Sequence, residues 1–243
     1  MFCRREGVSQ EHVFAKWVRD ALPGGGAFTH KYGDGTTWQS RIPDLKANRT
    51  CRECNNRWIA RLDDATKPTL TSALRGEATT IARGSPQATV AAWCFKTVLL
   101  LELCAKGRAA FIKPRDYRAF YELRHPPPVA FIWLAAYRPG PDEAEFQAGW
   151  VRPWDARFHL RDGSDREGYG ITFNVGHLAV QVVGHDPPDD LNLRQSGDMP
   201  AGDSRDYLLP LWPTTGDAIE WPPRFGFDAA GLEALSNLTR SDA

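Results

Sequence analysis

Hydrophobic periodicity along the chain predicts a helical middle followed by a strand-rich second half. The longest apolar pattern, SPQATVAAWCFKTVLLLELCAK at residues 85–106, has its apolar residues at helical spacing and ends just before Gly107. Ser85 followed by Pro86 is typical of a helix start. We expect this helix to form the hydrophobic centre of the protein.

The pattern changes after HPPP at residues 125–128, because consecutive prolines end a helix. The following runs are rich in β-branched and aromatic residues: VAFIWLAAY, EFQAGWVRPW, ARFHLR and YGITFNVGHLAVQVVGH. They predict an antiparallel sheet of about five strands. The acidic segment HDPPDDLNLRQSGDMPAGDSRD is expected to be a loop, and DAAGLEALSNL a closing helix capped by Asp228.

Shorter patterns complete the predicted architecture. VFAKWVRDAL and NNRWIARLDDA near the N-terminus are helical, and the Gly- and Thr-rich segment between them is expected to be a loop with one short hairpin. KPRDYRAFYELRH predicts an amphipathic helix, whose aromatic stripe of Tyr117, Phe120 and Tyr121, with Arg124 beside it, favours packing on a core over nucleic-acid binding. We predict an α+β fold of three regions: residues 1–70, a helical segment at 71–125 and a β-rich region at 126–243.

Composition is that of an ordinary globular protein, with 42% apolar and 25% charged residues. No run approaches the roughly 18 uninterrupted apolar residues of a membrane span, and no basic region followed by an apolar one is found at the N-terminus. The cytoplasm is therefore the expected location, with no membrane partner.

The net charge of zero hides a marked asymmetry between the two halves. Residues 1–125 hold 21 Lys and Arg against 12 Asp and Glu, whereas residues 126–243 hold 9 against 18. Lys and Arg drive phosphate binding, so the basic half either faces a polyanion or neutralises the acidic half internally. The charge alone leaves both interpretations open.

The five cysteines fall into two groups. Cys94 and Cys104 lie in the long apolar helix and are expected to be buried thiols. Cys51 and Cys54 form a CxxC turn, CRECNNRW, whose spacing lets two sulfurs converge on one tetrahedral zinc ion, and Cys3 is the expected third ligand. A fourth ligand is either a Cys upstream of Met1, or His30 or a carboxylate; a third reading is that the zinc has been lost.

Glu11 and His12 stand side by side in SQEHVFAKW at residues 9–17. Taken alone, such a pair is best explained as an acid in the first turn of a helix beside an exposed imidazole. Neighbouring side chains on a strand point to opposite faces, so the two reach one ion only where the strand ends. His159, His177 and His185 have no ligand spacing and are expected to be surface or core histidines.

Cys3, SQEHVFAKW and CRECNNRW together resemble the HNH endonuclease superfamily, whose ββα-metal motif is often enclosed by a zinc site of two CxxC knuckles. The resemblance is closest to the subgroup that reads CxxC, EHxFPxW and CxxCNxxW, and it covers about residues 1–70. It implies an N-terminal ββα-metal module. Two departures are Ala15 in the place of the usual proline, and Lys46 near the position of the central asparagine, with Asn48 the nearest amide.

The resemblance implies a hydrolase that cleaves phosphodiester bonds, with DNA as the expected partner. His12 would be the general base, and Glu11 and Asn55 would hold Mg²⁺ or Mn²⁺ through oxygen. Zinc on Cys3, Cys51 and Cys54 would be structural. Arginines near the knuckle are expected to contact phosphates: Arg49, Arg52, Arg57 and Arg61.

Two other functions stay open on the same residues. One is a catalytically weakened zinc-knuckle protein that binds nucleic acid or a protein partner, and the other is a thiol redox protein that cycles Cys51 and Cys54. The sequence leaves open the choice between DNA and RNA, the sequence or modification specificity, the role of residues 126–243 and whether the chain forms a homodimer.

Overall fold

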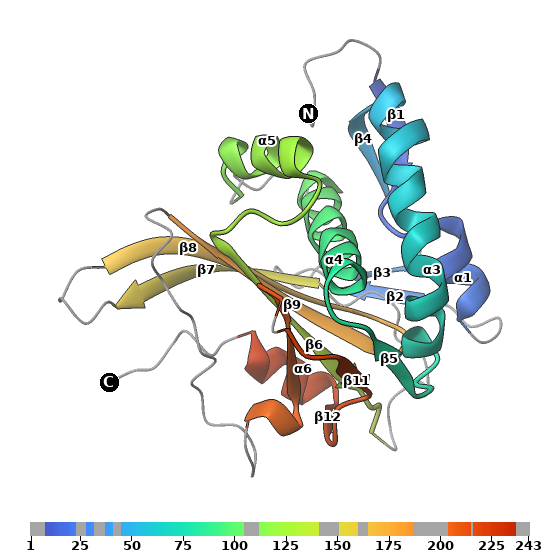
Figure 1. The fold of residues 1–243 in the computed structure, drawn as a ribbon, viewed down its shortest axis with the longest axis vertical. Coiled ribbons are helices and arrows are strands. Elements are labelled where there is room, and N and C mark those ends of the chain that lie inside the picture. The colour runs from blue at the N-terminus through green and yellow to red at the C-terminus, as the bar shows by residue number, and fades with distance from the viewer. Residues whose placement is uncertain are drawn as a thin grey trace.

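The computed structural model describes residues 8–22, 28–31, 37–40, 45–104, 112–140, 151–159, 165–186, 204–214 and 216–236. It mixes helices and strands, which confirms the predicted α+β class (Figure 1). In chain order, the elements are β1 (Val8–His12), α1 (Lys16–Ala21), β2 (Phe28–Lys31), β3 (Thr37–Ser40), β4 (Lys46–Cys51), α2 (Arg52–Cys54), η1 (Asn55–Ile59), α3 (Ala60–Leu74), β5 (Thr79–Ile81), α4 (Ser85–Cys104), α5 (Pro114–Leu123), β6 (Ala130–Tyr137), β7 (Val151–His159), β8 (Asp165–Val175), β9 (Leu178–His185), η2 (Ser204–Asp206), β10 (Leu208–Trp212), β11 (Ile219–Trp221), β12 (Gly226–Phe227) and α6 (Ala229–Leu235).

The N-terminal part is a two-stranded antiparallel sheet followed directly by helix. β1 pairs with β4, with Val8 opposite Cys51 and His12 opposite Lys46, and a bulge lies between Ser9 and Glu11. The segment between these strands holds α1 and the hairpin β2–β3, the latter in the expected loop. β4 then runs without a break into α2, the π-helical turn η1 and α3. Strand, strand and helix therefore follow in that order, although about 33 residues are inserted between the strands.

The second half forms the main sheet, in the order β10, β6, β9, β8 and β7, all antiparallel. The predicted runs form four of these strands, β6 to β9, whereas β10 was not predicted; β12 adds a short parallel pair with β6. β7 is one strand where the sequence predicted two runs, and it continues through Pro153. An edge strand tolerates proline, because the missing N–H costs no ladder bond on its outer side.

Helices cover both faces of this sheet (Figure 1). Alternate side chains of β6 point to opposite sides: Ile132 and Leu134 join the core that contains α4, while Phe131 and Trp133 join the core that contains α6. α4 begins at Ser85 as predicted, and residues 90–101 are all buried. α6 is capped as expected, with the Asp228 side chain accepting a hydrogen bond from the Gly231 N–H at 2.7 Å.

The larger core joins all three predicted regions. It contains Phe14 and Trp17 from the first, Trp93 and Phe95 from the second, and side chains of the main sheet, among them Phe173. Phe14 and Phe173 lie 6.3 Å apart between ring centroids. The N-terminal unit is thus packed against the helical middle and the sheet.

Among the described helices, α4 alone has the length and hydropathy to cross a membrane. Of that stretch, 72% is buried inside the protein. The burial accounts for its apolar composition, as in the core helix of a globular protein.

Candidate functional site

The CxxC turn lies where β4 ends and the helix begins. Cys51 is the N-cap of α2, and its Sγ accepts a hydrogen bond from the Cys54 N–H at 3.2 Å. Both cysteines are thiols and are 4% and 3% exposed. A backbone N–H donated to sulfur at a helix N-terminus stabilises the thiolate, the form that binds metal. The pair therefore suits a soft metal such as zinc.

The remaining predicted zinc ligands lie outside the described residues. These are Cys3 and the side chain of His30. Within the part of the chain that the structure describes, no three His, Cys, Asp or Glu side chains cluster as a metal site. Cys94 is buried in the core helix as expected, whereas Cys104 in the same helix is only half-buried. Partial burial still raises the pKa of the Cys104 thiol to about 11, which makes it a poor ligand at neutral pH.

Asn55 connects the knuckle to the strand that carries Glu11 and His12. Its Nδ2 donates to the carbonyl oxygen of Gln10 at 3.0 Å and to Ser9 Oγ at 3.3 Å, and Ser9 Oγ in turn donates to the carbonyl oxygen of Thr50 at 3.0 Å. Both amide N–H groups are thereby used on β1. The amide oxygen Oδ1 is the atom that Asn55 can offer to a cation.

His12 and Glu11 face opposite sides of β1. His12, the last residue of the strand, is exposed and pairs through its backbone with Lys46. Glu11 is 6% exposed and faces the interior. β1 ends at His12, so the pair lies at a strand end as the sequence led us to expect, but the buried Glu11 and the exposed His12 have different surroundings there.

The surroundings of Glu11 are those of a buried carboxyl group. Burial raises its pKa from 4.5 to about 7; the charge of Lys96 lowers the pKa and that of Asp63 raises it, both to a smaller extent. Lys96 Nζ is bound to Asp63 Oδ1 at 2.8 Å and to the Val13 carbonyl oxygen at 3.4 Å. In this setting we expect the Glu11 carboxyl group to help hold β1 against α3 and α4. This differs from its predicted role as a cation ligand beside His12.

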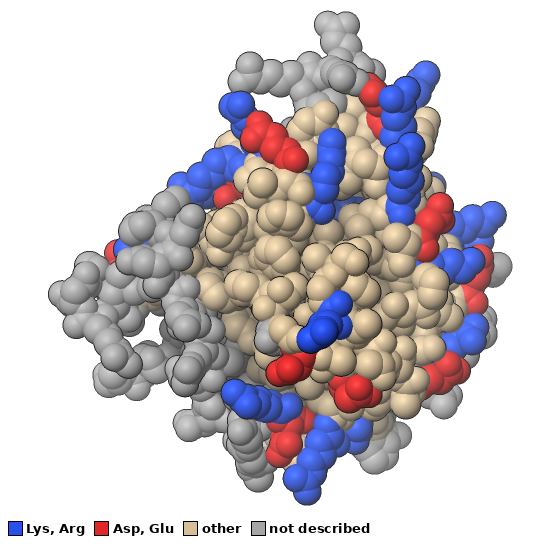
Figure 2. Space-filling model, in the orientation of Figure 1, with Lys and Arg blue, Asp and Glu red and all other residues tan. Residues whose placement is uncertain are grey.

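The predicted phosphate contacts differ in their accessibility. Arg52, Arg57 and Arg61 are exposed, and Arg57 forms an ion pair with Glu53 at 3.2 Å. The side chain of Arg49 lies outside the described set. In the view of Figure 2, basic side chains gather over the upper part of α3 and around α5, the region that holds the knuckle.

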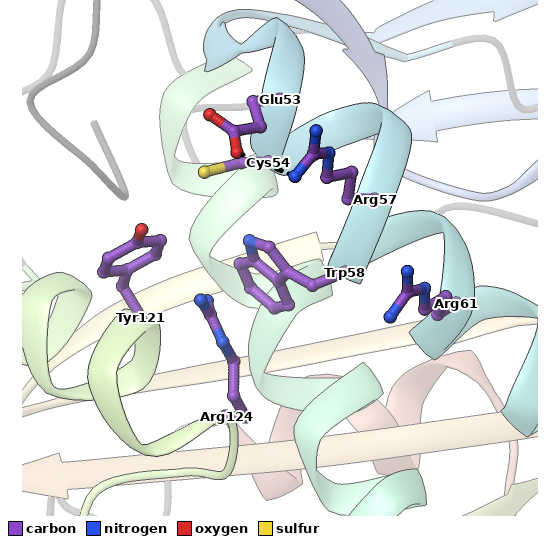
Figure 3. Close-up of a pocket in the computed structure, with 7 residues that line it drawn as sticks. All are labelled: Glu53, Cys54, Arg57, Trp58, Arg61, Tyr121 and Arg124. Atoms are coloured by element: carbon purple, nitrogen blue, oxygen red, sulfur yellow. Dashed lines mark ion pairs between the residues drawn. The ribbon is translucent and has the colours of Figure 1, made fainter.

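A pocket of about 270 Å³ opens beside the knuckle, between the start of the helix and α5 (Figure 3). It is lined by Glu53, Cys54, Arg57, Trp58, Arg61, Tyr121 and Arg124. Sequence reasoning named Arg57 and Arg61 but assigned the aromatic stripe of α5 to the core. Tyr117 and Phe120 are indeed buried, whereas Tyr121 and Arg124, one turn further, face the pocket. Tyr121 and Arg124 could have been predicted as pocket residues from the sequence, because they are aromatic and basic side chains close to a helix expected to bind phosphate.

The histidines of the sheet behave as expected, as far as they are described. His177 Nδ1 lies 2.9 Å from the Tyr137 carbonyl oxygen, and buried His185 stacks on Phe131 with ring centroids 5.9 Å apart. The side chain of His159 is outside the described residues.

Comparison of the chain with family models, curated proteins and solved structures finds no match. The case for a function therefore depends on the site residues and their geometry.

Proposed function

We propose that the chain is a metal-dependent HNH-type endonuclease that hydrolyses phosphodiester bonds of DNA. The observation that carries the proposal is the 3.0 Å hydrogen bond from Asn55 Nδ2 to the Gln10 carbonyl oxygen, because it joins the CxxCN helix to the strand that ends at His12. The two segments are 45 residues apart in sequence. The antiparallel pair of β1 and β4, followed directly along the chain by α2, η1 and α3, supports a ββα-metal module.

His12 is the proposed general base. Its side chain is exposed at the end of β1, where a water molecule and a phosphodiester have access to it. A neutral imidazole accepts a proton from the attacking water, and histidine is the side chain whose ordinary titration range permits this near pH 7. The backbone of His12 is held by the pairing of β1 with β4, in which His12 lies opposite Lys46.

The chain offers donors for two kinds of metal ion. Cys51 and Cys54, with Cys3 as the proposed third ligand, fit a structural zinc ion. Asn55 Oδ1 fits Mg²⁺ or Mn²⁺, which when bound would stabilise negative charge on the scissile phosphate. Glu11 does not fit the second site, because its carboxyl group is buried toward Lys96. We assign it the role of a positioning residue for β1.

The proposal is tested by nicking of supercoiled plasmid DNA with Mg²⁺ or Mn²⁺, with wild type, His12→Ala and Gln10→Ala. Gln10 is a matched control, because its side chain is exposed on the same strand while only its backbone carbonyl contacts Asn55. Loss of a general base should slow nicking at least about 100-fold in His12→Ala and leave DNA binding intact. Full nicking by His12→Ala, or no metal-dependent nicking by wild type, would refute the nuclease.

A second candidate is a zinc-knuckle protein that binds nucleic acid or a protein partner without cleaving it. The burial of Glu11 favours this candidate, because it removes one oxygen ligand from the expected catalytic site. Such a protein should bind DNA and show no nicking with any divalent metal.

A further inference from the structure

The pocket beside the knuckle contains a guanidinium group held between two aromatic rings. Arg124 Cζ lies 4.4 Å from the ring centroid of Trp58 and 4.2 Å from that of Tyr121. Figure 3 shows the Arg124 side chain rising between the two rings toward the pocket. The two rings themselves meet edge to face, with centroids 6.5 Å apart and an interplanar angle of 67°. Aromatic and guanidinium groups grouped in this way offer faces on which an unpaired nucleobase can stack.

The platform is built by two elements that pack directly on each other. Trp58 lies in the π-helical turn η1 and packs on Phe120 with ring centroids 5.5 Å apart. α5 is anchored on α4 by Tyr117, whose hydroxyl donates to the Leu99 carbonyl oxygen at 3.1 Å. The two walls of the pocket are thus held at a defined separation before any ligand binds.

The charge of the pocket is positive. Its lining contains three arginines against one carboxylate, and that carboxylate, Glu53, is paired with Arg57. Within the described part of the chain, neither Arg61 nor Arg124 has a carboxylate partner. Their guanidinium groups are therefore available to bind phosphate oxygens.

The backbone at Arg124 adds a second observation. This residue follows α5 with φ of 62°, the left-handed conformation in which glycine or asparagine is the usual choice. Among the described residues, it is the only non-glycine with positive φ. An arginine at such a position bears a backbone cost, which is consistent with a requirement for its side chain.

We propose that this pocket binds one unpaired nucleotide of a single-stranded DNA segment, with the base on the Trp58–Arg124–Tyr121 platform and the phosphate on Arg61. This inference rests on the proposed nuclease function and specifies its substrate. The pocket volume of about 270 Å³ is just below the roughly 300 Å³ at which small-molecule pockets begin, a size for one nucleotide and not for a duplex. Cys54 lines the pocket, and the next residue, Asn55, is hydrogen-bonded to β1. A DNA strand bound in the pocket would therefore continue toward His12.

The test measures binding of a fluorescent single-stranded oligonucleotide of about 12 nucleotides and of an abasic strand of equal length. Fluorescence anisotropy is recorded without added divalent cation and without chelator, so that the knuckle keeps any zinc. The variants are Arg124→Asn, which suits the left-handed backbone, and Tyr121→Leu. Arg118→Gln is the matched control, because Arg118 is an exposed arginine of the same helix, paired with Glu122 at 2.8 Å and outside the pocket.

Wild type should bind the base-containing strand about tenfold more tightly than the abasic strand. Arg124→Asn and Tyr121→Leu should reduce this ratio to about one, while Arg118→Gln should keep it. The proposal would be refuted if wild type bound both oligonucleotides with equal affinity. It would also be refuted if either pocket variant kept the wild-type ratio and melting temperature. A tenfold ratio that Arg118→Gln also abolishes would refute it as well.

The two proposals fail separately. The binding ratio is also measured in the His12→Ala background, where cleavage plays no part. If the ratio of the two affinities depends on Arg124 but wild type does not nick plasmid, the nuclease proposal is refuted and the nucleotide-pocket proposal stands. If wild type nicks plasmid with metal but the ratio does not change in Arg124→Asn, only the nucleotide-pocket proposal is refuted.

Discussion

Lys96 Nζ lies 2.8 Å from Asp63 Oδ1 inside the protein, with the lysine side chain fully buried and the carboxylate only 10% exposed. The pair joins α4 to α3, and the second hydrogen bond of Lys96, to the Val13 carbonyl oxygen, reaches the residue that follows β1. Glu11 faces the same group. The strand end that presents His12 is therefore fastened to the two helices behind it by buried charges.

We expect Lys96→Met to destabilise the fold by about 3 to 5 kcal/mol, because it leaves the Asp63 carboxylate buried without its counterion. The double variant Lys96→Met with Asp63→Leu should recover most of this loss, since neither charge then remains. Urea unfolding followed by circular dichroism measures both. A loss of less than about 1 kcal/mol in the single variant would show that the pair is not stabilised by mutual charge.

Glu11 should make stability depend on pH. Its pKa is raised from 4.5 to about 7 in the fold, so the folded state holds the proton more tightly, and the associated stability is complete below about pH 4.5 and lost as pH rises through about 7. Glu11→Gln cannot ionise, so its free energy of unfolding should rise relative to wild type across this window, by up to about 3 kcal/mol. Glu77→Gln, at an exposed glutamate, is the control and should track wild type. Parallel pH profiles for wild type and Glu11→Gln would contradict the interpretation.

The elements with strong periodicity could be predicted from the sequence. α4 begins at Ser85, α6 is capped by Asp228, and the strand runs after residue 128 form the antiparallel sheet. In each case, local pattern and turn chemistry agree with the final packing. The separation of EFQAGWVRPW from ARFHLR at Asp155 was wrong, because β7 runs through this residue and pairs with β8 along its whole length.

The candidate site was predictable only in part, since its geometry depends on contacts between distant segments. The CxxCN signature correctly indicated that Asn55 would meet the strand of His12. Glu11 is buried near Lys96, which reads in sequence as one of two charges in an apolar helix. Tyr121 and Arg124 lie beside Trp58 only because α5 packs across the start of the knuckle helix, a contact that no local pattern encodes.

The knuckle predicts a zinc dependence that does not involve catalysis. Purified wild type should contain about one zinc ion per chain by mass spectrometry, and Cys51→Ser should lose it and melt at a lower temperature. Cys104→Ala, at a half-buried thiol of α4, should keep its zinc. Retention of stoichiometric zinc by Cys51→Ser would remove the cysteine from the site.

Asn55 and Asn56 are adjacent amides with different predicted consequences. Asn55 donates two hydrogen bonds to β1, whereas Asn56 is exposed on the helix. Asn55→Ala should therefore lower the free energy of unfolding by about 1 to 2 kcal/mol, and Asn56→Ala should change it by less than about 0.5 kcal/mol. Urea unfolding separates the two.

Two substitutions of Asn55 distinguish its support of β1 from its proposed binding of a cation. Asn55→Asp removes the amide donors to β1 but keeps an oxygen where Oδ1 stood. If Oδ1 holds Mg²⁺, Asn55→Asp should retain metal-dependent nicking that Asn55→Ala loses, although both variants lose the two hydrogen bonds to β1. Equal nicking by both variants, in a titration of Mg²⁺, would mean that Asn55 acts only by holding the knuckle helix against β1. Asn56→Ala should nick plasmid as wild type does, because the Asn56 side chain is exposed and no hydrogen bond to β1 is assigned to it among the described residues.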